Sequence, residues 1–215
     1  MITVKTFIFN DFQENTFLLF DETDECIIID AGCYTDNEIA QITNFIDNNK
    51  LKPVLLLNTH FHIDHILGVS ALKQKYNIPV LGNNNDNFIL ETAEEYGKQF
   101  GFDKHISFDI DKNLNDGDIV KFGNSELKTL FVPGHTPGHL AFYSKNDNFV
   151  IVGDVLFKGS IGRTDLPGGD LDILYKSIKE KLLTLDGLTQ VLPGHGYFTT
   201  ISLEKKNNPF IADVL

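Results

Sequence analysis

The sequence of 215 residues has no tryptophan, one methionine and only two cysteines, Cys26 and Cys33. Two cysteines without close spacing build neither a disulfide scaffold nor a zinc knuckle, so both are predicted to be plain buried thiols. No apolar run approaches the roughly 20 residues that span a bilayer, and the first residues lack the layout of a signal peptide. These absences predict a cytoplasmic protein with no membrane partner.

Positive charge is also scarce. The chain has 18 lysines and arginines and 30 aspartates and glutamates, which gives a net charge of −12. The average field of the chain would repel the phosphate backbone of a nucleic acid, so we do not expect nucleic acid as a partner. We expect a small-molecule substrate. No linker or repeat divides the chain. We therefore expect one domain over residues 1–215. The oligomeric state is left open.

Short β-type runs and helical patterns alternate along the chain. The pattern indicates an antiparallel start, a buried strand that runs to His60, and a second block of strands, which together predict a layered α/β protein. The expected strands are residues 4–9, 15–20, 26–32, 53–60, 78–82, 119–122, 127–132, 140–144, 149–153 and 189–194. The expected helices are residues 37–49, 66–76, 86–100 and 172–183.

The most informative segment is the run from His60 to His65, which begins where the buried strand ends. Alternate side chains of an extended stretch point the same way, so His60 and His62 converge. Asp64 and His65 open the expected next helix, where they face the same space. Imidazole and carboxylate together are the ligands that borderline divalent metals prefer, and the segment therefore predicts a metal site.

Three further segments offer the same ligand chemistry, each where an apolar strand ends in glycine-rich backbone. They are FVPGHTPGH, VIVGD and VLPGH, which carry His135, Asp154 and His195. Glycine and proline let the chain turn sharply there and present these side chains on loops above a rigid sheet. We expect all three to join the His60 to His65 segment as metal ligands.

These motifs resemble those of the metallo-β-lactamase superfamily. The resemblance rests on THFHIDH, GHTPGH, GD at Asp154, PGHG at His195 and IDAG at Asp30, and it spans nearly the whole chain. The stretch GDVLFKGSIGRTDLPGGD resembles the small glyoxalase II-like branch, whose members are hydroxyacylglutathione hydrolases or general metal hydrolases. The family implies an αββα four-layer sandwich, in which two mixed sheets are flanked by helices and metals lie at one edge.

The resemblance also implies a role for each residue. Two divalent ions would be bound, with zinc ranked ahead of iron or manganese. Asp30 and His139 would support the ligands by hydrogen bonds, and Arg163 and Tyr197 would contact the substrate. The first ion would be held by His60, His62 and His135, the second by Asp64, His65 and His195, and Asp154 would bridge them.

A hydroxide held between two ions is a ready nucleophile toward a carbonyl that the ions also polarise. A thiolate then leaves more easily than an alkoxide, which favours a thioester or a related small acyl substrate. Asp64 is the candidate for proton relay beside its role as a ligand. Asp165 stands where glutathione-binding relatives carry a tyrosine, so the sequence does not single out glutathione thioesters.

Three alternatives remain open at this point. Persulfide dioxygenases share the fold and a similar GRTD stretch, and they use one iron held by two histidines and one aspartate. Lactonases resemble the same motif set, and lactone carbonyls suit the same hydroxide. A domain that binds metal or ligand without turnover is the third. Retention of both Asp64 and His195 favours the dinuclear hydrolase, because a mononuclear centre does not need them as ligands.

Overall fold

A computed structural model describes residues 1–104 and 107–212 of the chain. The chain divides into two compact units. The first comprises residues 1–114 and 121–126, and the second comprises residues 115–120 and the chain from 127 onward. His105, which the sequence predicts to be an ordinary surface residue, lies outside the described residues, and the single domain expected over 1–215 stays a prediction.

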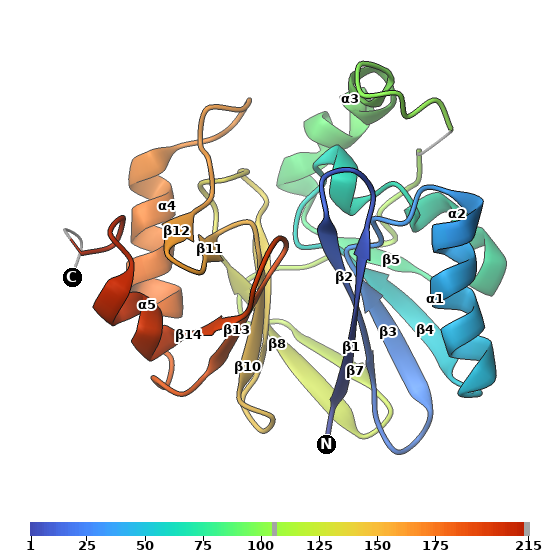
Figure 1. Cartoon of the computed structure of the whole chain (residues 1–215), viewed down its shortest axis with the longest axis horizontal. Coiled ribbons are helices and arrows are strands. Elements are labelled where there is room, and N and C mark those ends of the chain that lie inside the picture. Colours follow the sequence, from blue (N-terminus) through green and yellow to red (C-terminus); the bar gives the residue numbers. More distant parts are fainter. Residues whose placement is uncertain (105–106, 213–215) are drawn as a thin grey trace. The chain divides into compact units, whose positions relative to one another are not determined.

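The first unit is built on a six-stranded mixed sheet (Figure 1). The first three strands pair antiparallel, as the sequence predicts, and the remaining pairs are parallel. Parallel strands place their carboxyl ends at the same edge, which is where the histidine motif follows. In spatial order the strands are β1 (Thr3–Phe9), β2 (Glu14–Phe20), β3 (Glu25–Ile29), β4 (Lys52–Leu57), β5 (Val80–Gly82) and β6 (Lys112–Asn113).

Three helices belong to this unit: α1 (Asp36–Asn48), α2 (Val69–Tyr76) and α3 (Asn87–Lys98). A capping box begins α1, in which the Thr35 side chain accepts from the backbone of Glu38 and the Glu38 side chain accepts from the backbone of Thr35. In Figure 1, α1 and α2 lie on one side of the sheet. Apolar side chains of the sheet and helices form one buried core, which includes Ile28, Ile42 and Leu56.

Most of a second mixed sheet belongs to the second unit, and β10 and β13 pair parallel within it. Helices α4 (Leu171–Ser177) and α5 (Ile201–Asn207) lie beside it in Figure 1, and a π-helical turn over residues 178–182 extends α4. Leu174, Ile178 and Val191 belong to its buried core. In spatial order the strands are β14 (Thr199–Thr200), β13 (Gln190–Pro193), β10 (Phe149–Gly153), β9 (Leu140–Ser144), β8 (Ser125–Phe131) and β7 (Ile119–Phe122).

Two mixed sheets flanked by helices confirm the predicted α/β class, and most predicted elements agree with the structure within a few residues. One local prediction is wrong: Asp64 and His65 lie in a separate 3-10 turn (Ile63–His65), and α2 begins only at Val69. The sequence analysis also missed α5 and a hairpin of two short strands, β11 (Leu156–Phe157) and β12 (Ser160–Ile161). Among the described residues, no helix has the length and apolarity to cross a membrane.

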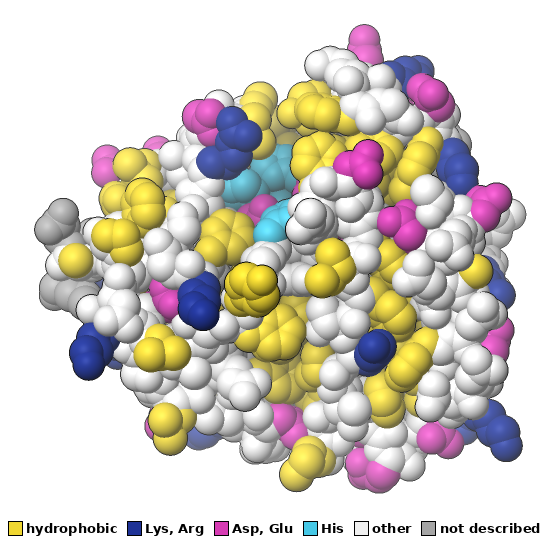
Figure 2. Space-filling model, in the orientation of Figure 1, with side chains coloured by type: hydrophobic (Ala, Val, Ile, Leu, Met, Phe, Trp, Pro, Cys, Tyr) yellow, Lys and Arg dark blue, Asp and Glu magenta, His cyan; other side chains and the backbone are white. Residues whose placement is uncertain are grey.

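Charged side chains are spread over the surface, and lysines and arginines are scattered across the face shown in Figure 2. Asp21, which follows β2, is an exception because its side chain is only 5% exposed. It accepts four hydrogen bonds, from the backbone and hydroxyl of Thr23, the backbone of Asn124 and the hydroxyl of Ser125. Burial opposes ionisation, but these hydrogen bonds prevail and lower the pKa of Asp21 to about 2.

Asp21→Asn is expected to lower the free energy of unfolding by about 2 kcal/mol at neutral pH. Because the folded pKa lies below the unfolded one, this stabilisation is complete above about pH 5 and is lost as the pH falls toward 2. Urea unfolding of the wild type and of Asp21→Asn, at pH 7 and near pH 2.5, measures the difference in the free energy of unfolding. The exposed Asp47→Asn is the matched control. A loss of stability that is equally large at both pH values would contradict the assignment.

Candidate metal centre

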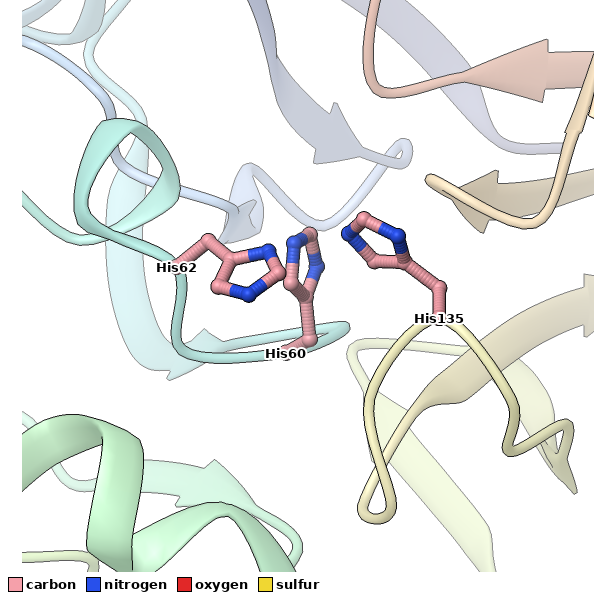
Figure 3. Close-up of side chains that lie close together, drawn as sticks. All are labelled: His60, His62 and His135. Atoms are coloured by element: carbon pink, nitrogen blue, oxygen red, sulfur yellow. The ribbon is translucent and has the colours of Figure 1, made fainter. Parts of the chain in front are cut away.

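The histidine motif of the first unit lies on the loop that follows β4. The rings of His60 and His62 lie 4.8 Å apart between centroids (Figure 3), and those of His60 and His65 lie 4.2 Å apart. His60 and His65 are buried, whereas His62 is half-buried. Asn58 holds the loop closed, because its side-chain amide donates to the backbone carbonyl of His65 over 3.1 Å. The extended chain at His62 and the following 3-10 turn thus gather four ligand-type residues.

Asp30, at the end of β3, fixes the orientation of His60 through Thr59. The Asp30 carboxylate accepts from the backbone N–H and from the hydroxyl of Thr59, each at 2.7 Å. The Thr59 hydroxyl has one proton and gives it to Asp30, so its oxygen accepts from Nδ1 of His60 at 3.0 Å. The proton of the neutral His60 ring is therefore on Nδ1, and Nε2 is the atom that offers a lone pair.

Asp30 also contacts His65. Its Oδ2 lies 3.2 Å from Nδ1 of His65, while Nε2 of His65 lies 3.5 Å from Oδ2 of Asp64. Asp30, His60 and His65 each place one ligand-type atom within 4.8 Å of the others. Asp64 is anchored through its backbone carbonyl, which accepts from the side-chain amide of Asn10 at 2.9 Å. Asp30 thus contacts both Thr59 and His65, and its role in supporting metal ligands stays a prediction.

Glu14, the first residue of β2, is a member of this cluster that the sequence analysis missed. Its side chain is fully buried, with Oε1 3.9 Å from Nδ1 of His65 and Oε2 accepting from the hydroxyl of Thr16 at 2.7 Å. Burial raises the pKa of Glu14 well above its ordinary value, and the nearby Asp30 adds to the rise while His65 opposes it. In the sequence, Glu14 is only the first residue of a strand, and nothing there indicates that its carboxyl is buried beside His65.

The second unit gathers its own ligand-type residues at the ends of three strands. His135 lies on the loop after β8, Asp154 follows β10, and His195 follows β13. Oδ2 of Asp154 lies 3.8 Å from Nε2 of His135 and 3.5 Å from Nε2 of His195. Gly162 packs so tightly here that a Cβ atom would collide with the backbone carbonyl of Asp154. This collision shows why glycine is needed at that position.

Two hydrogen bonds orient the residues of the second unit. Nδ1 of His135 donates to the backbone carbonyl of Arg163 over 2.7 Å, which leaves Nε2 as the lone-pair atom of the neutral ring. The backbone N–H of Asp154 donates to Nε2 of the fully buried His139 over 3.1 Å. His139 therefore supports the backbone of Asp154, and its role in supporting metal ligands stays a prediction.

The donor atoms fit a divalent metal ion. Nitrogen and oxygen ligands lie about 2.1 Å from zinc, so two of them on one tetrahedral ion are about 3.4 Å apart. The pairs His65 with Asp64 and His195 with Asp154 are each separated by 3.5 Å. Each unit therefore presents a histidine cluster with carboxylates of the kind that holds divalent metals, and the full set of seven ligands stays a prediction.

The two cysteines take no part in this chemistry. Both are buried, and burial raises the pKa of Cys26 and that of Cys33 to about 12. Thiols with such a pKa are protonated at neutral pH and are neither nucleophiles nor metal ligands. The prediction of plain buried thiols is confirmed.

A pocket of about 530 Å³ opens beside the ligands of the second unit. Arg163 and Tyr197, the predicted substrate contacts, both line it. The guanidinium of Arg163 forms a bidentate ion pair with Asp165, with N–O distances of 2.6 and 2.7 Å. The hydrogen bonds from Arg163 lower the pKa of Asp165 to about 2, so this pair persists over the neutral range.

Comparison with known proteins identifies the family. A model of the metallo-beta-lactamase superfamily matches residues 9–195. Hydroxyacylglutathione hydrolase GloC of Haemophilus influenzae is 38% identical over 202 residues, which is 93% of each chain. The probable metallo-hydrolase YqgX of Bacillus subtilis is 40% identical over 200 residues, 93% of this chain and 92% of that one. The crystal structure of TTHA1623 in a di-iron-bound form is 34% identical with a TM-score of 0.86, and the match covers 96% of this chain and all of that one.

The chain belongs to the metallo-beta-lactamase superfamily, a superfamily of metallo-hydrolases, and has its fold. Among the similar proteins, one is named as a hydroxyacylglutathione hydrolase and another is shown in a di-iron-bound form. The predicted family and fold are therefore confirmed.

Asp30→Asn is expected to weaken metal binding by about 10- to 100-fold, although no ligand is removed. Asparagine tolerates the left-handed backbone of Asp30 (φ 54°) but lacks the charge that Thr59 and His65 contact. Thr59→Val should weaken binding in the same direction without a change of charge. Competition with a chelating dye measures the affinity, and Asp47→Asn is the charge-matched control. If Asp30→Asn left the metal affinity unchanged, Asp30 would have no supporting role in the metal site.

Proposed function

We propose that this protein hydrolyses thioesters, or related small acyl compounds, with a dinuclear metal centre. The proposal rests on the ligand geometry: hydrogen bonds leave Nε2 of His60 and Nε2 of His135 as lone-pair atoms. Nε2 of His65 lies 3.5 Å from Asp64 and Nε2 of His195 lies 3.5 Å from Asp154, the spacing of two ligands on one metal ion. The resemblance to a hydroxyacylglutathione hydrolase supports the choice of a thioester.

The candidate ligands suit two metal ions, each with a different set of ligands. When bound, two divalent ions would generate a nucleophilic hydroxide near neutral pH and polarise the substrate carbonyl. Mixed imidazole and carboxylate ligands suit zinc, iron and manganese alike, and zinc is our first choice. We propose that one ion is held by His60, His62 and His135, the other by Asp64, His65 and His195, and that Asp154 contacts both.

The residues of the chain then orient the site and move a proton. The carboxylate of Asp64, which is mostly buried beside His65, would accept a proton from the attacking water and later release it to solvent. Asp30 and His139 would keep the ligands in place through Thr59 and the backbone of Asp154. No protein acid is needed for the leaving group, because a thiol is acidic enough to depart as the thiolate.

The pocket of the second unit would receive the substrate. It has the volume of an ordinary small-molecule site, and its lining runs from His135, Asp154 and His195 to Arg163 and Tyr197. A small acyl compound that enters this pocket meets the proposed ligands at one end. We therefore propose a small molecule, and neither a nucleic acid nor a membrane, as the partner.

Protein reconstituted with zinc, iron or manganese is expected to bind about two ions per chain and to cleave simple thioesters, and chelation should abolish the activity. His62→Ala should lower kcat/KM by more than 100-fold, because it removes a ligand rather than a supporting group, and should lower metal content with it. Metal analysis measures the number of ions per chain, and thiol release measures the activity. His105→Ala, outside every ligand motif, is the matched control.

Two outcomes would contradict this proposal. One is the absence of thioester cleavage with any of the three metals. The other is a single bound iron together with oxygen uptake in the presence of glutathione persulfide, which would identify a dioxygenase. Faster cleavage of lactones than of thioesters would keep the metal centre but replace the substrate class.

A further inference from the structure

The β11–β12 hairpin forms one wall of the pocket in the second unit. Phe157, Lys158 and Ile161 of the hairpin line the pocket, and Tyr197 faces Lys158 across it, with Nζ 5.9 Å from the ring centroid. The ring of Phe157 lies 6.5 Å from that of His195, so the hairpin begins beside a proposed metal ligand. The wall is therefore apolar near the ligand and cationic at the hairpin tip.

A buried network fixes the hairpin tip. Glu204 of α5 is 3% exposed, and its carboxylate accepts from the backbone N–H of Gly159 over 2.8 Å and from the hydroxyl of Thr199 over 2.5 Å. The Asn208 amide donates to the carbonyl of Ser160 over 3.0 Å and to Glu204 over 2.8 Å. Gly159 turns the chain with a left-handed φ of 74°. Lys158 thus stands on a rigid turn, which reduces the entropy lost on binding.

Two cations line the pocket, and they differ in their partners. The guanidinium of Arg163 is neutralised by its bidentate pair with Asp165. Lys158 is exposed and, among the described residues, forms no ion pair with a carboxylate. The chain carries a net charge of −12, so its average field repels anions. A local cation without a carboxylate partner therefore provides the attraction that an anionic substrate needs.

We infer that Lys158 and the adjacent ring of Tyr197 form a carboxylate-binding subsite, so that the enzyme prefers acyl substrates bearing a carboxylate over neutral ones of the same size. The inference rests on the proposed hydrolysis and names its substrate class. The stem of Lys158 and the rings of Phe157 and Tyr197 cover the aliphatic part of the substrate, and the ammonium group meets the carboxylate at the pocket mouth.

The test compares thioesters that differ only by a carboxylate in place of a methyl group. Succinyl and butyryl thioesters of N-acetylcysteamine place the charge on the acyl side. S-Acetyl-3-sulfanylpropanoate and S-propyl thioacetate place it on the thiol side. In at least one pair, wild type should prefer the anionic member. Lys158→Gln should reduce this preference about fivefold, through KM rather than kcat, and Lys158→Glu should reverse it. The effect should weaken as salt is added.

A binding measurement separates this inference from the proposed function. Calorimetry compares the thioethers S-(3-carboxypropyl)-N-acetylcysteamine and S-butyl-N-acetylcysteamine, together with thioethers of 3-sulfanylpropanoate and propanethiol. Tighter binding of a carboxylate form, lost in Lys158→Gln, would support the subsite even if no thioester were cleaved. Lys145→Gln, an exposed lysine outside the pocket, is the matched control and should leave every ratio unchanged.

Three outcomes would overturn the inference. The first is cleavage of thioesters with no preference for the anionic members. The second is a preference that Lys158→Gln leaves intact in both turnover and binding. The third is a preference that Arg163→Gln removes and Lys158→Gln does not, which would assign the carboxylate to the arginine despite its pair with Asp165.

Discussion

The buried carboxylate of Asp30 is the constraint on which the ligand loop of the first unit depends. Burying a charged group is costly unless hydrogen bonds satisfy it, and Thr59 and His65 supply those bonds. The same bonds determine which nitrogen of His60 offers its lone pair. Glu14 and Asp64 bring further carboxylates to this cluster, whose acidic character favours a cation beside the histidines.

The second unit reaches an equivalent result with different groups. There the backbone carbonyl of Arg163 takes the place of a carboxylate and holds Nδ1 of His135, and His139 accepts from the backbone of Asp154. The bond to Nδ1 of His135 leaves its Nε2 directed at the ligand side, whereas Nε2 of His139 is used to hold the backbone of Asp154. Two units of different sequence thus orient imidazoles by hydrogen bonds to their far nitrogen, a common feature of metal-binding histidines.

Charge has opposite local and global signs in this protein. The strongly acidic chain and the carboxylates around His65 suit cations, whereas the pocket beside His195 is lined by two cations. Asp165 neutralises one of them, Arg163, and Lys158 is the cation to which we assign substrate selection. The proposed metal centre and the proposed anion-selective pocket are compatible in one acidic protein because short-range contacts outweigh a field that salt screens.

The sequence by itself determined the family, the α/β class and the identity of the ligand-type residues, because metal ligands need particular side chains at fixed spacing and strand ends carry a clear pattern. It did not reveal Glu14, whose burial results from the packing of β2 on both faces, nor the β11–β12 hairpin, whose two-residue strands are too short to show a period. The tautomers of His60 and His135 and the anchoring of Lys158 through Glu204 were decided only by the tertiary structure. Each depends on groups far apart in the chain that only the fold brings into contact.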